Sequence, residues 1–586
     1  MEKLELSNLL KAIRKFEKES VDDNQGLRIA IIGSTALQYF VKFLKYALHH
    51  EGIKCSILEG EYDSIRFEVF DNNSQLYAFK PNIVILLPFF TDLKQYPTLL
   101  ATKKEVYTLL SQEISYYKTV WEYLSQIDKV NILQANFVLP PIKELGNLEF
   151  QIESSKGSFI REVNQKLNQE KLSNVIIVDA DALSNNIGKY NWFNYSAYYL
   201  NKAPVSLEFM PEFVDLFVQE IKALNGNTKK CLVLDLDNTL WGGVVGDVGF
   251  DSIQIDPNNA VGEAFRSFQS YCLNLKSRGV ILAVCSKNEL EIAKEPFLKN
   301  ENMILKLDDI SCFVANWENK AENLKAISQQ LNIGTESFVF FDDNPAEREI
   351  VKQFLPEVRV IEVPNDPALY VLQMEKEHPF EWLQITKEDL VRSQSYLENK
   401  ERMAMQEKFV NYTEYLQALD MKGGVYQTTD SEVSRFAQLI NKSNQFNLRT
   451  IRYTESDIHN FIADKNTVCL YAKLTDSFSN YGIISCVILK FKDDTCFIDT
   501  WVMSCRVLKR TVENMMFAKI LDVAKEQNCS RIIAEYLQTK KNKMVENFYE
   551  TLGFELESSN KVNEALVKEY LLTNISITPE FFITEE

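Results

Sequence analysis

Histidine is scarce in this sequence, and several signals that would place the chain in a special class of proteins are missing. Four of the 586 residues are histidine, and the ten cysteines are scattered without a CxxC pair or the spacing of a zinc site. No stretch approaches the roughly 20 uncharged apolar residues of a membrane-spanning helix. The start, MEKLELSNLLKAIRKFEKES, lacks the apolar core of a signal peptide. We therefore expect a cytoplasmic protein with reduced thiols and no membrane association.

Positive charge is also in deficit. The chain has 64 lysine and arginine residues against 82 aspartate and glutamate residues, for a net charge of −18. Because nucleic-acid phosphates demand a basic surface, this balance argues against a nucleic-acid partner. The hydrophobic content of 46% is ample for packed cores, and the length predicts about three or four domains.

Two successive segments have the pattern of a parallel sheet. In residues 1–225 and again in residues 226–380, short apolar strands alternate with helical stretches. The expected strands end near residues 34, 88, 137, 183, 234, 288, 345 and 364. This alternation is typical of doubly wound α/β domains, in which helices cover both faces of a buried sheet.

The rest of the chain has a different character. Residues 381–424 are charged and helical in pattern, and we expect them to be a connector. Residues 425–586 begin with consecutive β-strands and continue with helices near 510–527 and 541–551. Antiparallel strands followed by helices indicate an α+β domain.

Polar residues follow the strands of the second segment at the points where these strands end. Asp235 and Asp237 come directly after one strand, Ser286 ends the next, and Asp342 follows a third. Ligands of doubly wound sheets bind at the carboxyl ends of the strands, so these residues are expected to share one site. Two carboxylates this close together can converge on a hard cation such as Mg²⁺.

Residues 235–239 read DLDNT and match the DxDxT motif, so this segment resembles the haloacid-dehalogenase superfamily. The resemblance implies Mg²⁺-dependent phosphoryl chemistry. It implies that Asp235 is the nucleophile and a metal ligand, and that Asp237 is the general acid and base and offers a backbone carbonyl to the metal. Asn238 and Thr239, in the same motif, are expected to contact the substrate.

Three further residues match motifs of that superfamily, in the same order along the chain. Ser286 matches the residue that binds phosphate, and Lys320 matches the lysine that pairs with the phosphoryl group and the nucleophile. Asp342, which Asp343 follows, matches the acidic residue that completes the metal site. The metal ligands implied by the resemblance are Asp235, Asp237 and Asp342.

The surrounding sequence is similar to the FkbH-type branch of this superfamily. The similar stretches are DLDNTLWGGVVGD, VCSKNE, FVANWENKAENL, FVFFDDNPAERE, NKSNQFN and SCRVL. The resemblance implies that a glyceryl group from 1,3-bisphosphoglycerate passes through an enzyme thioester and loses its remaining phosphate. It also implies an acyl carrier protein, with its 4′-phosphopantetheine arm, as the partner that receives the glyceryl group.

That chemistry requires a thiolate, and Cys285 is the candidate because it directly precedes Ser286. Lys287 and Mg²⁺ could lower the pKa of the Cys285 thiol. However, successive strand residues point to opposite faces, so Cys285 can equally be a buried core residue if Ser286 faces the ligand. The sequence leaves both alternatives open.

The last segment resembles the GNAT acetyltransferase fold in the stretch KNKMVENFYETLGF, which begins at Lys541. The resemblance implies that Asn542 and Tyr549 lie beside a pantetheine arm. The stretch that should bind pyrophosphate has no glycine, which departs from that family. Arg506, Lys509 and Arg510 in it would instead suit the phosphate of a carrier protein's phosphopantetheine, or form a solvated basic helix start.

The first segment resembles SGNH hydrolases at Gly33-Ser34-Thr35 and at Asn136. That family closes its site with an Asp-x-x-His pair, whereas no histidine occurs between Asp181 and Tyr199 here. A serine without its base is a poor nucleophile. We therefore expect a degenerate domain that serves in scaffolding or docking.

Three functions are consistent with these features. The first is a Mg²⁺-dependent phosphatase and glyceryl transferase that loads an acyl carrier protein. The second is a small-molecule phosphatase fused to a coenzyme A-dependent acyltransferase, in polysaccharide or secondary-metabolite synthesis. The third is a non-catalytic scaffold that binds a carrier protein, and the intact set of Asp235, Asp237, Ser286, Lys320 and Asp342 weighs against it.

Overall fold

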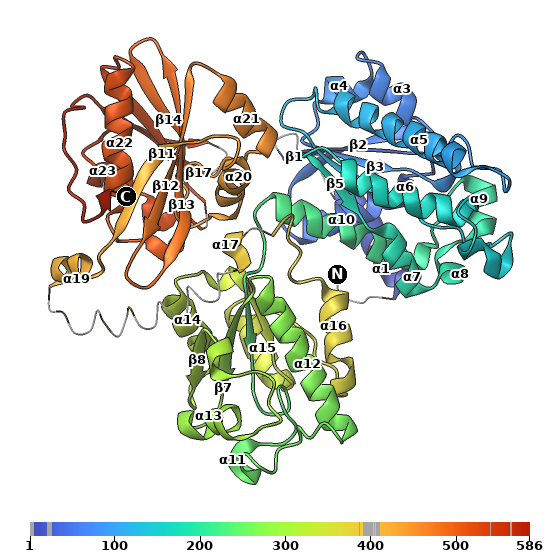
Figure 1. Cartoon of the computed structure of the whole chain (residues 1–586), viewed down its shortest axis with the longest axis horizontal. Helices are drawn as coiled ribbons and strands as arrows, with labels where there is room; N and C mark the ends of the chain where they lie inside the picture. Colours follow the sequence, from blue (N-terminus) through green and yellow to red (C-terminus); the bar gives the residue numbers. More distant parts are fainter. Residues whose placement is uncertain are drawn as a thin grey trace. The chain divides into compact units, whose positions relative to one another are not determined.

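The structure is a computed structural model that describes residues 5–19, 26–385, 387–390, 402, 405, 409, 411–539, 541–562 and 565–585. Figure 1 traces the chain in colour from the N-terminus in blue to the C-terminus in red. By its internal contacts the chain divides into two compact units. One unit is Met1–Lys222 with Thr454–Asp457, and the other is Ala223–Tyr453 with Ile458–Glu586. The connector predicted for 381–424 lies partly outside the described residues.

The first unit contains a five-stranded sheet in the order β2-β1-β3-β4-β5, with every pair parallel. Its strands are β1 (Leu27–Gly33), β2 (Cys55–Tyr62), β3 (Ile83–Leu87), β4 (Asn131–Ala135) and β5 (Val175–Val178). Every residue of β3 is buried, as expected for a strand that is covered on both faces. The parallel α/β architecture predicted for this segment is confirmed.

Helices of this unit begin where the sequence supplies a side-chain cap. The hydroxyl of Thr102 accepts the backbone N–H of Glu105 at the start of α5 (Lys103–Leu124), and Ser155 caps α6 (Lys156–Glu170) in the same way. Both helices pack on one face of the sheet. The other helices are α1 (Leu6–Glu19), α2 (Gln38–His50), α3 (Ile65–Phe70), α4 (Gln75–Phe79), α7 (Ala180–Ile187), α8 (Lys189–Trp192), α9 (Tyr195–Asn201) and α10 (Met210–Leu224).

The second unit contains another five-stranded parallel sheet, in the order β10-β9-β6-β7-β8. Its strands are β6 (Cys231–Leu234), β7 (Ile281–Ser286), β8 (Cys312–Ala315), β9 (Phe338–Phe341) and β10 (Arg359–Val360). Successive residues pack on opposite faces: Leu232 and Leu234 on one, Cys231 and Val233 on the other. The second predicted parallel sheet is therefore confirmed as well.

Each face of this sheet has its own helices. The face with Leu232 packs against α12 (Ala260–Ser277), α13 (Leu290–Lys299) and α16 (Tyr370–Glu377). The face with Val233 packs against α14 (Lys320–Leu331) and α15 (Pro345–Phe354). A short helix, α11 (Val245–Val248), lies in the segment that follows β6.

An eight-stranded mixed sheet completes the second unit, in the order β16-β17-β15-β14-β13-β12-β11-β18. Its strands are β11 (Lys422–Gln427), β12 (Thr467–Thr475), β13 (Asn480–Lys492), β14 (Thr495–Met503), β15 (Arg531–Leu537), β16 (Glu555–Val562), β17 (Ala565–Leu572) and β18 (Thr584–Glu585). The pairs β14–β15 and β11–β18 are parallel and the others are antiparallel.

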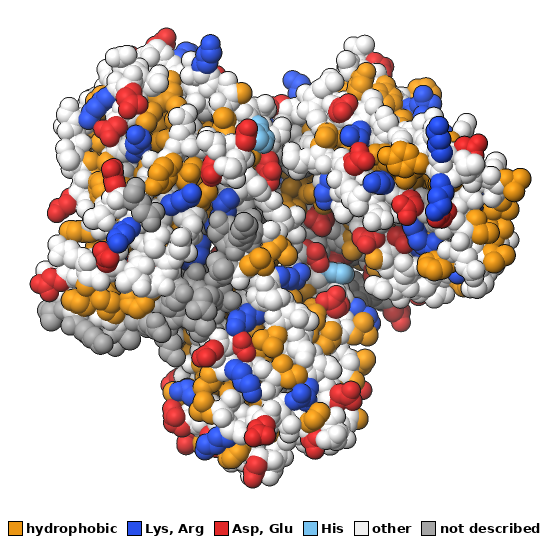
Figure 2. Space-filling view, viewed as in Figure 1, with side chains coloured by type: hydrophobic (Ala, Val, Ile, Leu, Met, Phe, Trp, Pro, Cys, Tyr) orange, Lys and Arg blue, Asp and Glu red, His pale blue; other side chains and the backbone are white. Residues whose placement is uncertain are grey.

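Helices α22 (Val512–Glu526) and α20 (Val433–Lys442) pack in separate apolar clusters against this mixed sheet. The remaining helices are α17 (Lys387–Leu390), α19 (Tyr412–Ala418), α21 (Glu455–Ala463) and α23 (Phe548–Thr551). Within the described part of the chain, no helix combines the length and the apolar character needed to cross a membrane. Acidic and basic side chains are interspersed over the face that Figure 2 shows.

Candidate active site

Two acidic segments meet where the strand order of the second sheet reverses. The chain runs from β6 to β7 and β8 on one side, and then returns to β9 on the other side of β6. Asp235 directly follows β6, and Asp342 directly follows β9. The backbone N–H of Asp235 donates to the carbonyl oxygen of Phe341 at 3.0 Å, so the two strand ends stay paired up to this point. Such a reversal is the usual ligand crevice of an open parallel sheet.

Lys320, the first residue of α14, bridges the two segments. Its Nζ lies 2.6 Å from Asp235 Oδ1 and 2.9 Å from Asp342 Oδ2, and it donates to the carbonyl oxygen of Cys285 at 2.7 Å. The side chain is only 2% exposed. Burial alone would lower the pKa of Lys320, but the carboxylates of Asp235 and Asp342 raise it well above its usual value. Lys320 is therefore a fixed positive charge.

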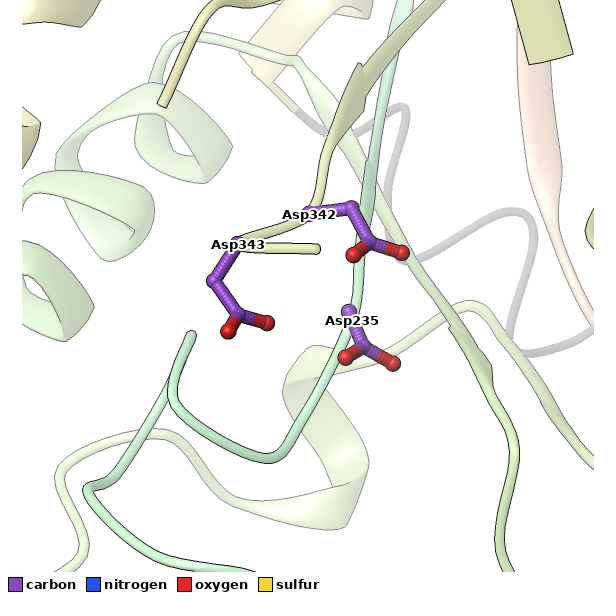
Figure 3. A group of neighbouring side chains, drawn as sticks. All are labelled: Asp235, Asp342 and Asp343. Atoms are coloured by element: carbon purple, nitrogen blue, oxygen red, sulfur yellow. The ribbon is translucent and has the colours of Figure 1, made fainter. Parts of the chain in front are cut away.

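Three carboxylates crowd around this lysine. Oxygens of Asp235, Asp342 and Asp343 lie within 4.8 Å of one another, and the carboxylates face a common space (Figure 3). Burial, and next the charge of Asp235, raise the pKa of Asp343 to about 7, and the same two causes raise the pKa of Asp342. Crowded carboxylate oxygens of this kind are suitable ligands for a hard divalent cation.

The side chain of Asp237 is held by three hydrogen bonds. Its Oδ1 accepts from Trp241 Nε1 at 3.0 Å and from the backbone N–H of Val245 at 2.9 Å, and its Oδ2 accepts from Asn288 Nδ2 at 2.8 Å. Burial raises the pKa of Asp237 despite these bonds. A carboxyl group with a raised pKa and a fixed position is suited to donate a proton to a leaving group.

The predicted substrate contacts Asn238 and Thr239 differ in position. Asn238 lines the pocket, has a left-handed backbone (φ 52°), and accepts the backbone N–H of Gly243 through its side-chain oxygen at 2.9 Å. Gly243 has φ 95°, a conformation that favours glycine and lets the chain turn here. Thr239 is fully buried, and its hydroxyl accepts the N–H of Asp343 at 3.3 Å. Thr239 therefore supports the site from beneath.

A pocket of about 480 Å³ opens in front of these residues. It brings together six of the residues singled out in the sequence, namely Asp235, Asp237, Asn238, Ser286, Lys320 and Asp342. Ser286 is 1% exposed, and its hydroxyl accepts from Asn288 Nδ2 at 3.3 Å. The pocket also contains Asp343, which belongs with Asp342 to the predicted acidic motif, and Asn288, to which sequence reasoning gave no role although it lies two positions after Ser286.

Cys285 is adjacent in sequence to Ser286, which lines the pocket, but Cys285 itself does not line it. Its side chain is fully buried in the cluster with Val233 and α14, and its Sγ lies 4.0 Å from the carbonyl oxygen of Lys320. Burial raises the pKa of the thiol to about 12. None of the ten cysteines lines the pocket. The structure thus favours the core interpretation of Cys285 over the nucleophile.

The basic residues proposed for a pantetheine phosphate do not form one exposed surface. Arg510 and Arg506 are each 8% exposed. Arg510 Nη1 lies 3.0 Å from Asp476 Oδ2 and Arg506 Nη2 donates to the carbonyl oxygen of Tyr481 at 3.3 Å. Of the three, Lys509 alone is exposed. Two of the guanidinium groups are therefore used within the fold.

The two residues expected beside a pantetheine arm are also buried. Asn542 is 0% exposed, and its Nδ2 donates to the carbonyl oxygens of Asn447 and Leu537, at 2.9 Å in both cases. Tyr549 is 1% exposed, and its hydroxyl has no hydrogen-bond partner among the described residues. Burial raises the pKa of Tyr549 well above its usual value. Neither residue reaches an open cleft.

The chain itself fills the gap between β14 and β15. These strands pair from Thr495 to Ile498 only, and then segment 446–448 lies between them. Phe446 accepts from the N–H of Met503 at 3.1 Å, and Leu448 donates to Trp501 at 3.3 Å and accepts from Leu537 at 2.9 Å, all through backbone groups. The gap between the two strands is thus closed by the protein's own backbone.

Polar groups at the end of the first sheet satisfy one another. Asn136 Nδ2 donates to Asp179 Oδ1 at 2.7 Å, and its Oδ1 accepts the N–H of Asp181 at 2.9 Å. The hydroxyl of Ser34 donates to Asp92. The serine thus has a carboxylate partner where the SGNH resemblance would require a histidine. This arrangement agrees with the expectation of a domain without that hydrolase chemistry.

Comparison with known families and structures gives two substantial matches. Residues 28–222 match the family model of the FkbH N-terminal domain. The N-terminal part of the protein BF1531 from Bacteroides fragilis, a crystal structure that contains a phosphatase domain complexed with Mg, is 33% identical to this chain. That match covers 64% of this chain and 99% of the other, with a TM-score of 0.58.

More distant structures match a smaller part of the chain. The ribosomal-protein-S18-alanine N-acetyltransferase from Escherichia coli is 10% identical, with a TM-score of 0.21, over 26% of this chain and 92% of the other. An acetyltransferase of the GNAT family from Streptococcus pneumoniae is 12% identical, with a TM-score of 0.21, over 26% and 98%. Scores this low carry no argument about function. The search of curated proteins gave no match.

Proposed function

This chain belongs to the FkbH family, with a phosphatase domain of the haloacid-dehalogenase type, and on that premise we propose that it is a Mg²⁺-dependent phosphatase with Asp235 as its nucleophile. The observation that carries the proposal is the placement of Lys320 between Asp235 and Asp342 at one end of a 480 Å³ pocket. Buried charges of both signs are costly, and a pocket that gathers them at a topological switch point is suited to catalysis.

Mg²⁺ fits the residues that are present. Asp235, Asp342 and Asp343 offer only carboxylate oxygens within 4.8 Å of one another, and burial, followed by the charge of Asp235, raises the pKa values of Asp342 and Asp343. These three side chains would hold the ion, together with the backbone carbonyl of Asp237 that the family resemblance implies. When bound, Mg²⁺ supplies positive charge that stabilises the phosphoryl oxygens in the transition state. A Mg-bound crystal structure of a 33% identical relative supports the same choice of metal.

In the first step, Asp235 attacks the phosphorus of a phosphomonoester. Lys320 holds Oδ1 of Asp235 at 2.6 Å, which leaves Oδ2 to form the new oxygen–phosphorus bond. The bond from phosphorus to the leaving oxygen breaks, and its electron pair stays on that oxygen. Asp237, with its raised pKa, gives the leaving oxygen a proton. The products are an alcohol and a phosphorylated Asp235.

In the second step, water releases the phosphate. Asp237, now a carboxylate, takes a proton from a water molecule as the water oxygen bonds to phosphorus. The bond between phosphorus and Asp235 breaks, which restores the Asp235 carboxylate and frees inorganic phosphate. The three hydrogen bonds from Trp241, Val245 and Asn288 keep Asp237 in place for both proton transfers.

Phosphate release from p-nitrophenyl phosphate tests this proposal. The wild type should release phosphate with Mg²⁺ and stop when EDTA removes the ion, and Asp235→Asn should lower the rate by roughly 10³-fold or more. Asp308→Asn, an exposed residue of the same parallel-sheet region that does not line the pocket, is the matched control. Metal-independent release, or an active Asp235→Asn variant, would sink the proposal.

FkbH membership also supports a finer function, loading of a glyceryl group onto an acyl carrier protein. We propose that 1,3-bisphosphoglycerate is the acyl donor and that the phosphatase site removes the phosphate that remains. Nine of the ten cysteines are buried, so the accepting thiol in this proposal is that of the carrier's phosphopantetheine arm, and the transfer precedes the phosphatase step. The thiol displaces the carboxyl phosphate, and a thioester and inorganic phosphate result.

Intact-protein mass spectrometry separates the two levels of the proposal. With 1,3-bisphosphoglycerate generated in situ, Mg²⁺ and a holo acyl carrier protein, we expect a glyceryl-sized mass gain on the carrier that requires this protein and persists with Cys285→Ala. Phosphate release without any mass gain on the carrier would support the phosphatase proposal and contradict the transferase proposal. A mass gain that disappears with Cys285→Ala would instead support a thioester intermediate on Cys285.

A further inference from the structure

The pocket around Asp235 is strongly acidic. Among the described residues, seven acidic side chains and two basic ones line it. Four of the acids are the residues at the catalytic end, Asp235, Asp237, Asp342 and Asp343, and the other three are Asp247, Glu289 and Glu347. A bound Mg²⁺ would offset two of these charges. The pocket would therefore remain negative even with its metal and its two lysines.

Both lysines of the described lining are already engaged by carboxylates. Lys320 contacts Asp235 and Asp342, as described above. Lys287 Nζ lies 2.6 Å from Glu347 Oε1, and the Glu347 side chain is 12% exposed. A second anionic group on a substrate would have to break one of these ion pairs to find a cation. The phosphate that reacts is neutralised by Lys320 and the metal. Any further negative charge on the substrate would find no free cation in the described lining and would be repelled.

The two remaining acids, Asp247 and Glu289, stand at the open side of the pocket. Asp247 lies on α11, and Glu289 directly precedes α13, which packs beside α11. Both side chains are exposed, in contrast to the buried Asp235 and Asp342. Glu289 makes no capping hydrogen bond to its helix. Neither acid is needed to hold the fold of this region. Their negative charges can therefore repel or attract a substrate that enters the pocket.

We propose that Asp247 and Glu289 select substrates by charge. The pocket takes phosphomonoesters whose remaining part is neutral or cationic, and it rejects those that carry a second anionic group. The physical basis is repulsion between like charges over distances shorter than the screening length of about 8–10 Å, in a pocket whose walls focus the field. This inference rests on the proposed phosphatase function and adds a substrate class to it.

The selection has a chemical consequence for the glyceryl proposal. Free 3-phosphoglycerate carries a carboxylate beside its phosphate, and 1,3-bisphosphoglycerate carries a second phosphate. A thioester of 3-phosphoglycerate has neither, because its carboxyl group is neutral. The pocket would therefore accept the phosphorylated glyceryl group after it is attached to a thiol and discriminate against the free acids.

Glycerol 3-phosphate and 3-phosphoglycerate form a matched pair of probes. They share the phosphate and the three-carbon chain, and they differ in a neutral CH₂OH group against a carboxylate. Each is measured with Mg²⁺ as a substrate, and also as a competitive inhibitor of p-nitrophenyl phosphate hydrolysis, so that a preference is obtained even where turnover is slow. We expect the wild type to favour glycerol 3-phosphate by roughly tenfold.

The variant Asp247→Asn/Glu289→Gln removes both charges with little change of shape. It should raise the efficiency toward 3-phosphoglycerate and bring the ratio close to one. The control is Glu291→Gln, two positions from Glu289, whose side chain is 85% exposed, pairs with Lys294 at 3.3 Å and does not line the pocket. Removal of one negative charge at Glu291, outside the pocket, should leave the tenfold preference intact. Raising the salt concentration should reduce the wild-type preference.

A wild-type ratio near one, or a ratio that the double variant does not change, would overturn the charge selection. That failure is distinct from failure of the phosphatase proposal, which p-nitrophenyl phosphate reports by itself. If its hydrolysis requires Mg²⁺ and Asp235 while the two glycerol compounds are treated equally, the phosphatase stands and the selection falls. If hydrolysis requires neither, the premise of the selection falls with it.

Discussion

The two parallel sheets of this chain share an architecture and differ at their carboxyl ends. In the first sheet, Asn136 bonds to Asp179 and to the N–H of Asp181, so the polar groups there satisfy one another. In the second, Asp235, Asp342 and Asp343 crowd together around a single lysine, and their charges are not balanced. The same fold thus has satisfied polar groups at the end of one sheet and unbalanced charges at the end of the other.

This difference teaches that the sheet supplies positions and the residues at the strand ends supply chemistry. A satisfied hydrogen-bond network stabilises the structure and leaves no unbalanced charge for a ligand to neutralise. Crowded carboxylates with raised pKa values are destabilising in the free protein, and a cation and a phosphoryl group relieve them. We therefore expect substitutions at the two ends to have unequal effects, and the following predictions run from the largest to the smallest.

Loss of the proton donor should have the largest effect. Asp237→Asn should lower kcat for glycerol 3-phosphate by roughly 10²–10⁴-fold, because the poor alkoxide leaving group needs a proton. The loss should be smaller for p-nitrophenyl phosphate, whose leaving group is stable without one. Asp92→Asn, the counterpart at the first sheet, should leave phosphate release unchanged. Equal losses with both substrates would contradict the role given to Asp237.

Removal of the buried lysine should damage both stability and activity. Lys320→Met leaves the carboxylates of Asp235 and Asp342 without their ammonium partner and should cost about 3–5 kcal/mol of unfolding free energy, measured by urea denaturation. Lys189→Met is the comparison at the first sheet, where the lysine contacts the single carboxylate Asp181 and the hydroxyl of Ser184. The loss of unfolding free energy should be clearly smaller for Lys189→Met. Equal losses in the two variants would contradict the proposed difference between the two sheets.

The stability of the Mg²⁺-free protein should depend on pH through the crowded carboxylates. The folded pKa of Asp343, about 7, is above its unfolded value of about 4, so the native state binds more protons than the unfolded state between these values. Stability should therefore fall as pH rises from about 4 to about 7. Asp92, whose pKa burial raises to about 6, contributes with the same sign in the first unit.

Thermal unfolding in EDTA at several pH values measures this dependence, and Asp343→Asn isolates the contribution of the site. The slope should be shallower in the variant than in the wild type. Saturating Mg²⁺ should also flatten the wild-type slope, because the cation replaces the protons. Identical slopes for wild type and Asp343→Asn would show that the crowding of these carboxylates is not what destabilises the free protein.

The smallest effect is expected at Cys285. Cys285→Ala keeps the backbone carbonyl that accepts from Lys320, so phosphatase activity should stay within about twofold, with a stability loss of about 1 kcal/mol. The buried thiol should also resist alkylation in the native protein, since its pKa is about 12. A large loss of activity in a correctly folded variant would return Cys285 to the chemistry.

Much of the phosphatase site was predictable because its parts are local. Asp235 and Asp342 each follow a buried apolar strand and Ser286 ends another, and parallel strands bring their carboxyl ends to one edge. That reasoning predicts the two parallel sheets and the gathering of these residues in one pocket. This prediction needs no knowledge of distant contacts, since the end of each strand can be predicted from the local sequence.

Other features depend on contacts that the sequence does not reveal. Cys285 and Ser286 are adjacent in one strand, and which of them faces the pocket is decided by the packing of α14 on the other face. The gap between β14 and β15 is filled by segment 446–448, which precedes both strands by many residues. No local pattern predicts that closure, so a pantetheine cleft was a reasonable expectation and the observed contacts argue against it.

The most direct test is to find the phosphoryl group on the protein. The wild type is mixed with p-nitrophenyl phosphate and Mg²⁺, quenched rapidly in acid, and analysed by intact-mass and peptide mass spectrometry. The account predicts a phosphoryl-sized mass gain on the peptide that contains Asp235, absent without Mg²⁺ and absent in Asp235→Asn. A phosphoryl group on another residue, or phosphate release that continues in Asp235→Asn, would contradict it.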